Sequence, residues 1–217
     1  MYRILTRYFD GVSRAQFRKD LDQKNWVILL ERDDRTLAGF STLLCYGAEH
    51  EGERLTVIYS GDTIVDRAAW GSSALPRAWI QTVLGLERAE GAERLIWLLI
   101  VSGFRTYRFL PVFFREFFPS FDRSASPGTG ALVAKLARER FGSDYDAARG
   151  VVHFTNPQRL CPELAQIPQR RRSSPHVKFF ERRNPGHAAG DELVCLAELS
   201  ETNLTRAGRR MLGGGLT

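Results

Sequence analysis

Runs of apolar residues separated by short polar turns predict the strands in the first half of the chain. Residues 26–31 and 37–46 are apolar and rich in strand-forming residues, and the charged turn 32–35 joins them, which predicts a hairpin. A further apolar run begins at Leu55, and another covers residues 94–101. We therefore expect a sheet in which a hairpin leads to two more strands.

Apolar residues three or four positions apart predict the helices. Phe17 and Leu21 lie four apart in residues 13–21, where Ser13 is a candidate N-cap. We expect further helices over residues 76–86, over residues 104–119 with a break or kink near Pro111, and over residues 131–141 with an end at Gly142.

The second half of the chain is richer in loop-forming residues. We expect a flexible connector over residues 122–130 and a loop-rich segment over residues 144–174, which holds a short strand at 151–154 and covers the site as a lid. The last ordered unit is predicted as a hairpin of residues 176–182 and 192–199, and the glycine-rich tail from Gly213 is expected to be frayed.

The most informative stretch is residues 59–75, which reads as a strand that passes through a turn of small residues into a helix. Gly71, Ser72 and Ser73 let backbone amides approach a ligand, and the positive end of the following helix dipole points at the same place. A phosphate or pyrophosphate suits this layout. The alternative is an ordinary turn whose small residues only let the helix pack.

In this order of elements, the segment resembles the GNAT superfamily of acyl-CoA-dependent N-acyltransferases. There the central strand ends in a valine, followed by a loop of the type Arg/Gln-x-x-Gly-x-Gly/Ala whose amides hold the pyrophosphate of coenzyme A. Val65 matches the valine and Gly71 a loop glycine, while Ser73 and Leu75 fall at the two signature small residues. Trp70 replaces the usual arginine, and the resemblance covers roughly residues 1–122.

The resemblance implies an α/β fold with a GNAT-like mixed central sheet flanked by helices, a C-terminal insertion and a hairpin. Residues 1–122 would form the acyltransferase core, residues 123–175 a helical and loop-rich insertion, and residues 176–217 a β-hairpin that completes the fold, with the tail. Acetyl-CoA or another acyl-CoA would be the co-substrate. The residues expected to bind it are Ile64, Val65, Trp70, Gly71, Ser72, Ser73 and Ala74.

Acyl transfer to an amine needs a base, and Asp62 on the central strand is the first candidate. Its alternative role is structural, as a carboxylate that caps backbone amides in a bulge of residues 60–63. The family usually carries a tyrosine that protonates the leaving thiolate, on the helix after the fifth strand. Phe113 stands at that place, so the other candidate donors are Tyr59, Ser102 and Tyr107.

The aromatic segment of residues 104–118 is either a core helix or the lining of a pocket for an apolar substrate chain. Phe104, Arg105 and Phe113 are the candidate pocket residues on it. His187, on a predicted tight turn, is a further pocket candidate, and the alternative for it is an exposed turn histidine without a task.

The net charge of +6 favours an anionic partner such as a nucleotide cofactor, an acidic substrate or RNA. The densest basic cluster, residues 170–172, lies in a predicted loop without a recognised RNA-binding signature, so nucleic acid is the minority interpretation. The cysteines and histidines lack zinc-ligand spacing, and we predict no metal.

No apolar run approaches the ~20 residues that span a bilayer, and the first residues lack a secretory signal pattern. We therefore expect a soluble protein without a membrane partner, in the cytoplasm. The sequence leaves the oligomeric state open.

Taken with the resemblance, these features predict transfer of an acyl group from a coenzyme A thioester to an amine of a small-molecule or peptide acceptor, by direct attack in a ternary complex. Two alternatives stay open. One is a GNAT-like binding or regulatory module that has lost coenzyme A binding, and the other is an acyltransferase that uses an aminoacyl-tRNA or a carrier-protein thioester.

Overall fold

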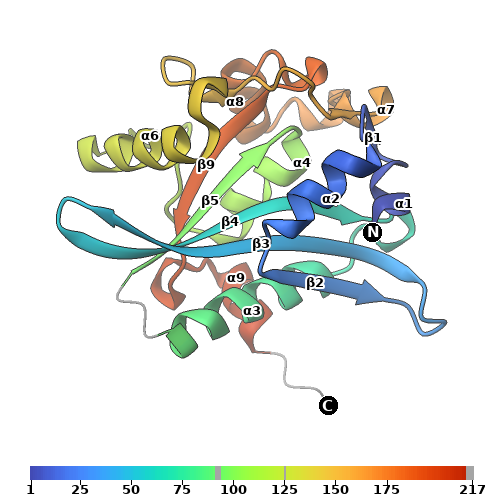
Figure 1. Cartoon of the computed structure of the whole chain (residues 1–217), viewed down its shortest axis with the longest axis horizontal. Helices are drawn as coiled ribbons and strands as arrows, with labels where there is room; N and C mark the ends of the chain where they lie inside the picture. Colours follow the sequence, from blue (N-terminus) through green and yellow to red (C-terminus); the bar gives the residue numbers. More distant parts are fainter. Residues whose placement is uncertain (91–93, 125, 214–217) are drawn as a thin grey trace.

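The centre of the fold is a seven-stranded mixed sheet, seen in a computed structural model that describes residues 1–90, 94–124 and 126–213. The strand order is β2-β3-β4-β5-β9-β7-β6, and only the β4–β5 pair is parallel (Figure 1). The strands are β2 (Trp26–Glu31), β3 (Leu37–His50), β4 (Glu53–Val65), β5 (Leu95–Val101), β6 (Tyr145–Asp146), β7 (Val151–Val152) and β9 (Glu192–Glu198). The predicted fold class, a mixed α/β sheet flanked by helices, is confirmed.

The four predicted strands of the first half are all present, and β2 has the predicted bounds. Strands β3 and β4 are longer than predicted and form a long hairpin that projects beyond the rest of the sheet (Figure 1). Glu51 and Gly52, with φ of 51° and 83°, make the turn between them. The residues at the tip of this hairpin are mostly polar, so the apolar pattern of the sequence did not indicate where the two strands end.

Helices cover both faces of the sheet, and the alternation of side chains along the strands divides the core accordingly. Ile58, Trp97 and Leu99 face one side, which is covered by α3 (Ala74–Glu90), α4 (Phe104–Tyr107), α5 (Phe109–Phe113), α8 (Pro175–Arg183) and α9 (Arg206–Leu212). Val57 and Leu98 face the other side, under α6 (Pro127–Phe141). A third cluster packs α1 (Tyr2–Leu5) and α2 (Arg14–Asp22) on the far part of β3 and β4.

Two predicted helix ends agree with the capping residues, but the predicted start of α6 is wrong: the helix begins at Pro127, capped by Ser126, so residues 127–130 of the expected connector are helical. The Ser13 hydroxyl accepts a hydrogen bond from the Gln16 amide at 3.0 Å, which confirms Ser13 as the N-cap of α2. Helix α6 ends at Gly142, whose φ of 56° is one that glycine adopts easily.

The predicted C-terminal hairpin is wrong, because residues 176–182 form helix α8 and not a strand. Pro175 occupies the first turn, where its missing N–H has no helical partner, and Val177 and Phe180, three residues apart, are both buried. Strand β9 pairs with β5 and β7 instead.

The predicted helix over residues 104–119 is also only partly correct. The break falls at Arg108, between α4 and α5, and Pro111 lies inside α5, which is short enough to tolerate it. Residues 114–119 are not helical, and Phe118 forms a β-bridge to Leu196.

Short elements complete the chain. They are β1 (Phe9–Asp10), β8 (Arg159–Leu160), α7 (Pro162–Ala165), and the 3₁₀ turns Arg67–Ala69, Gly142–Asp144, Gln169–Arg171, His187–Ala189 and Glu201–Asn203. Strands β1 and β8 pair antiparallel, so the expected lid segment is tied to the N-terminal part of the chain. The predicted frayed tail lies, apart from Gly213, outside the described residues, as does residue 125 of the predicted connector. No helix in the described part of the chain is both long and apolar enough to span a membrane.

Candidate active site

The two parallel strands in the middle of the sheet stop pairing before they end. The last β4–β5 pair joins Ser60 to Leu99, yet β4 continues to Val65 and β5 to Val101. A cavity of about 1680 Å³ lies at this divergence, and both strand ends line it. Open strand ends of this kind expose backbone groups and side chains to a ligand.

A bulge in β4 marks the place where the strands diverge. Ser41 pairs with Thr63 and Leu43 with Ser60, so that Gly61 and Asp62 together lie opposite one residue of β3. A bulge within residues 60–63 is therefore confirmed, but in the described part of the chain no backbone amide donates to the Asp62 carboxylate, so the expected capping role is not seen.

Side chains crowd the α-carbon of Gly61 at the bulge. A Cβ atom there would lie 2.7 Å from Lys24 Cε and 2.9 Å from Thr42 Oγ1. Lys24 thus crosses the bulge next to Asp62, and burial, together with Arg140, lowers the pKa of its ammonium group.

Asp62 lines the cavity and is partly buried. Burial raises the pKa of its carboxyl group to about 6, while the positive charge of Lys24 opposes the shift and Asp20 adds to it. A carboxyl group with this pKa is largely ionised at neutral pH and still accepts a proton readily, which suits a general base.

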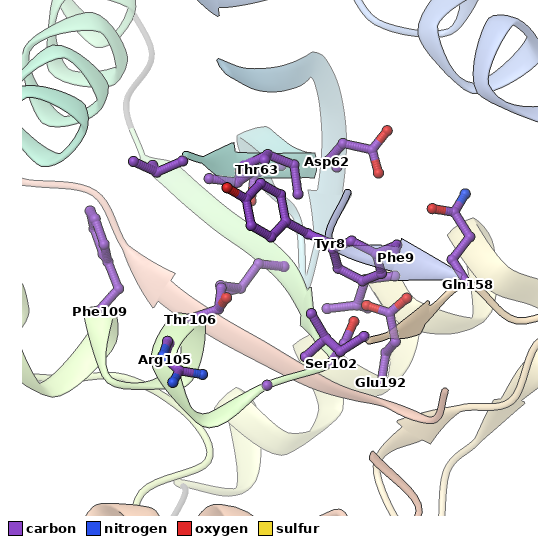
Figure 2. A pocket seen from close by; sticks show the side chains of 18 of the residues that line it. Tyr8, Phe9, Asp62, Thr63, Ser102, Arg105, Thr106, Phe109, Gln158 and Glu192 are labelled. Carbon is purple, nitrogen blue, oxygen red and sulfur yellow. The ribbon is translucent and has the colours of Figure 1, made fainter. Parts of the chain in front are cut away.

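A second carboxyl group, Glu192, lines the same cavity from the start of β9. Burial raises its pKa to about 7, the hydrogen bond with Ser102 opposes the shift, and Asp62 adds to it. Figure 2 shows Ser102 beside Glu192, with Asp62 beyond Tyr8 and Phe9 in this view.

Glu192 was not predicted as a site residue, although it is an acidic residue directly before the apolar run of β9. Its position next to Ser102 follows from the register of the antiparallel β5–β9 pair, which joins Val101 to Leu193 and thus brings residues 102 and 192 together. That register cannot be read from either strand alone.

The two candidate tyrosines lie in different places. Tyr59 lines the cavity, with Lys24 Nζ and Arg140 Cζ at 5.3 Å and 4.8 Å from its ring centroid. Tyr107 is fully buried and donates its hydroxyl to the Pro119 carbonyl at 2.8 Å, away from the residues that line the cavity. Burial raises the pKa of both phenols.

The loop before α3 forms another wall of the cavity. Of the predicted cofactor residues, all but Ser73 line it: Ile64, Val65, Trp70, Gly71, Ser72 and Ala74. The loop keeps part of its amides for itself, since the Trp70 and Ser72 amides bond within the turn, the Ala74 amide donates to Ser72 Oγ, and Pro76 has none. The amides of Gly71, Ser73 and Leu75 remain for a phosphate group, which fits the pyrophosphate of coenzyme A in part.

The predicted pocket residues separate into two groups. Phe104 and Arg105 line the cavity, together with the rings of Trp79, Trp97 and Phe109. Phe113 packs on Phe109, with ring centroids 4.5 Å apart, and is not among the lining residues.

His187 also lies away from the cavity. It is buried, and its two ring nitrogens contact the carbonyl oxygens of Asn184 at 2.9 Å and Ala165 at 3.2 Å. These contacts join the turn before β9 to the end of α7.

Comparison of the sequence with known protein families gives no match, and comparison with curated proteins gives none either. Solved structures do show similarity. A mutant of the AtaT toxin bound to the C-terminus of the antitoxin AtaR and acetyl-CoA is 18% identical, covering 48% of this chain and 71% of its own, with a TM-score of 0.34.

Two further similar structures have the same TM-score of 0.35. A protein assigned as a phosphinothricin N-acetyltransferase is 11% identical and covers 54% of this chain and 74% of its own. The KacTA–DNA complex is 15% identical, and the match covers 56% of this chain and 79% of the chain in that structure. These TM-scores are low, and the fold is defined by the strand order of the sheet and by the divergence of β4 and β5.

Proposed function

We propose that the protein transfers an acyl group from a coenzyme A thioester to an amine, with both substrates bound in the cavity between β4 and β5. The observation that supports this most is one continuous cavity that runs from the loop before α3 to the carboxyl groups of Asp62 and Glu192. It offers phosphate-binding amides at one end and proton acceptors at the other.

Acetyl-CoA or another acyl-CoA is the proposed donor. The free amides of Gly71 and Leu75, both of which line the cavity, would hold its pyrophosphate at the start of α3, where the helix dipole favours negative charge. The thioester would then lie between the diverging strands, next to the rings of Trp97 and Phe109.

Asp62 is the proposed base. An amine acceptor arrives mostly as an ammonium ion, and a carboxylate with a pKa of about 6 both attracts that cation and removes its proton. The neutral nitrogen then attacks the thioester carbonyl carbon, the carbon–sulfur bond breaks, and the extra proton that remains on the nitrogen passes to solvent.

The Ser102–Glu192 pair is the proposed proton source for the leaving thiolate, in place of the tyrosine that Phe113 replaces. Ser102 lines the cavity and bonds to Glu192, whose pKa of about 7 keeps it about half protonated at neutral pH. A proton that Ser102 gives to sulfur can thus be replaced from Glu192.

The test is release of free thiol from acetyl-CoA in the presence of amines, among them amino acids, polyamines and lysine peptides. Asp62→Asn should lower kcat/KM by about 100-fold or more, the range for loss of a general base. Asp33→Asn, in the exposed turn after β2, is the matched control and should keep the parent rate. Unchanged turnover in Asp62→Asn would remove Asp62 from the reaction.

A further inference from the structure

Arginine side chains from two parts of the chain gather at the end of the cavity next to Trp70. Arg105 and Arg108 come from α4 and its end, and Arg170 and Arg171 come from the turn Gln169–Arg171; all four line the cavity. Arg105 Cζ lies 4.9 Å from the Trp70 ring centroid.

These charges repel one another. Burial lowers the pKa of the Arg105 guanidinium, and the charges of Arg67 and Arg171 lower it further. Arg108 is affected in the same way by burial and by Arg171. The cluster is therefore close enough for its members to act on one ligand.

Acidic side chains in this region neutralise neighbouring arginines and not the cluster. Glu163 pairs with Arg67 at 2.8 Å, and Glu181 pairs with Arg172 at 3.2 Å. Within residues 1–90, 94–124 and 126–213, Arg108, Arg170 and Arg171 have no acidic partner within 4.0 Å. Like charges held together without counter-charge favour a polyanionic ligand.

The neighbouring loop offers a reason for such a cluster. Only the Gly71, Ser73 and Leu75 amides are free there, and the exposed ring of Trp70 lies between Arg67 and Arg105. Guanidinium groups form paired hydrogen bonds with phosphate oxygens, and an exposed indole ring can stack on a base.

We propose that Arg105, Arg108 and Arg171 form a polyphosphate site that, with Trp70, binds the nucleotide part of the acyl donor. The inference rests on the proposed acyl transfer for the identity of the donor. It requires a donor that carries at least two phosphate groups, and it assigns most of their binding to side chains and less to the loop amides.

Calorimetry with pyrophosphate and with adenosine 3′,5′-bisphosphate tests the site without any thioester. Arg108→Gln and Arg171→Gln should each weaken binding of both probes by about tenfold, equivalent to about 1.4 kcal/mol. Neither side chain makes a hydrogen bond in the described structure, so both variants should fold. Arg210→Gln, an exposed arginine of α9, removes the same charge elsewhere and should bind like the parent.

Equal affinity of the parent and both cluster variants would overturn the inference, as would an equal loss in Arg210→Gln. The inference would also be overturned if the two cluster variants bound a short single-stranded RNA more weakly than the parent but bound pyrophosphate as the parent does, because that result assigns the cluster to nucleic acid.

The Michaelis constants for two thioesters test the proposed function separately. Arg108→Gln should raise the KM for acetyl-CoA tenfold and leave that for acetylpantetheine unchanged. Pyrophosphate binding without turnover of any thioester contradicts acyl transfer and leaves the site standing.

Discussion

The carboxyl groups of Asp62 and Glu192 both line the cavity, and the charge of Asp62 raises the pKa of Glu192. The cavity wall around them is made largely of apolar strands. A buried carboxyl group resists ionisation, so the environment that makes these groups useful for proton transfer also destabilises the folded state at neutral pH. The effect should appear in the pH dependence of stability.

The stability of the parent should fall as the pH rises from about 4 to about 7. Both groups have a higher pKa in the folded state than their ordinary values of 3.8 and 4.5, so the folded state binds more protons over this range. Glu192→Gln should flatten the slope between pH 4.5 and 7 and stabilise the protein at pH 8 by about 2 to 3 kcal/mol.

Urea unfolding at a series of pH values measures this. Glu49→Gln, an exposed glutamate of β3 outside the cavity, is the control and should keep the slope of the parent. A steep loss of stability that persists in Glu192→Gln would contradict the buried ionisation of that group.

The sequence allowed one of these two carboxyl groups to be predicted. Asp62 could be found because it directly precedes the end of an apolar strand, where a family resemblance also applied. Glu192 depends on which residue of β5 lies opposite it, and the pairing of strands nearly a hundred residues apart carries no local signal.

At the scale of elements, the bulge in β4 positions Asp62. Gly61 and Asp62 together lie opposite one residue of β3, which bends strand β4 locally. Because Gly61 has no side chain, it leaves space for the Lys24 side chain. The bounds of β2, the turn 32–35 and the N-cap of α2 followed local rules and could be predicted. Helix α8 could not, because polar and apolar residues alternate over residues 176–179 as in a strand, and only the burial of both Val177 and Phe180 shows the helical face.

Gly61→Ala should destabilise the protein by about 1 to 3 kcal/mol, because the added methyl group would lie 2.7 Å from Lys24 Cε and 2.9 Å from Thr42 Oγ1. It should also displace Lys24 from Asp62 and raise the pKa of that carboxyl group. Thermal unfolding and the pH dependence of kcat/KM measure the two effects.

Gly47→Ala provides the comparison on the neighbouring strand. A methyl group there meets no atom within 4 Å, and the backbone does not have a positive φ, so this variant should be as stable as the parent or slightly more so. Equal effects of the two substitutions would show that crowding at Gly61 does not matter.

At the scale of the whole molecule, segments far apart in sequence build one cavity. The N-terminal region contributes Lys24, the diverging strands contribute Asp62 and Ser102, and the loop-rich segment contributes Asn156 and Arg171. A volume of about 1680 Å³ exceeds that of usual small-molecule pockets, which leaves room for donor and acceptor together. From the sequence, residues 144–174 were expected to cover the site, and Asn156 and Arg171 of that segment line the cavity; the β1–β8 pairing that ties the segment to the N-terminal part of the chain has no local signal in the sequence.

Binding of a coenzyme A thioester at the loop before α3 is the central claim, and calorimetric titration of the folded protein with acetyl-CoA tests it most directly. We predict one binding site per chain in the parent, binding weakened about tenfold or more in Ser72→Glu, and near-parent binding in Ser72→Gln, because Ser72 lines the cavity and only the charged side chain repels the pyrophosphate at the helix start. Absence of binding of acetyl-CoA, longer acyl-CoAs and free coenzyme A to the folded parent, or equal affinity in Ser72→Glu and Ser72→Gln, would contradict it.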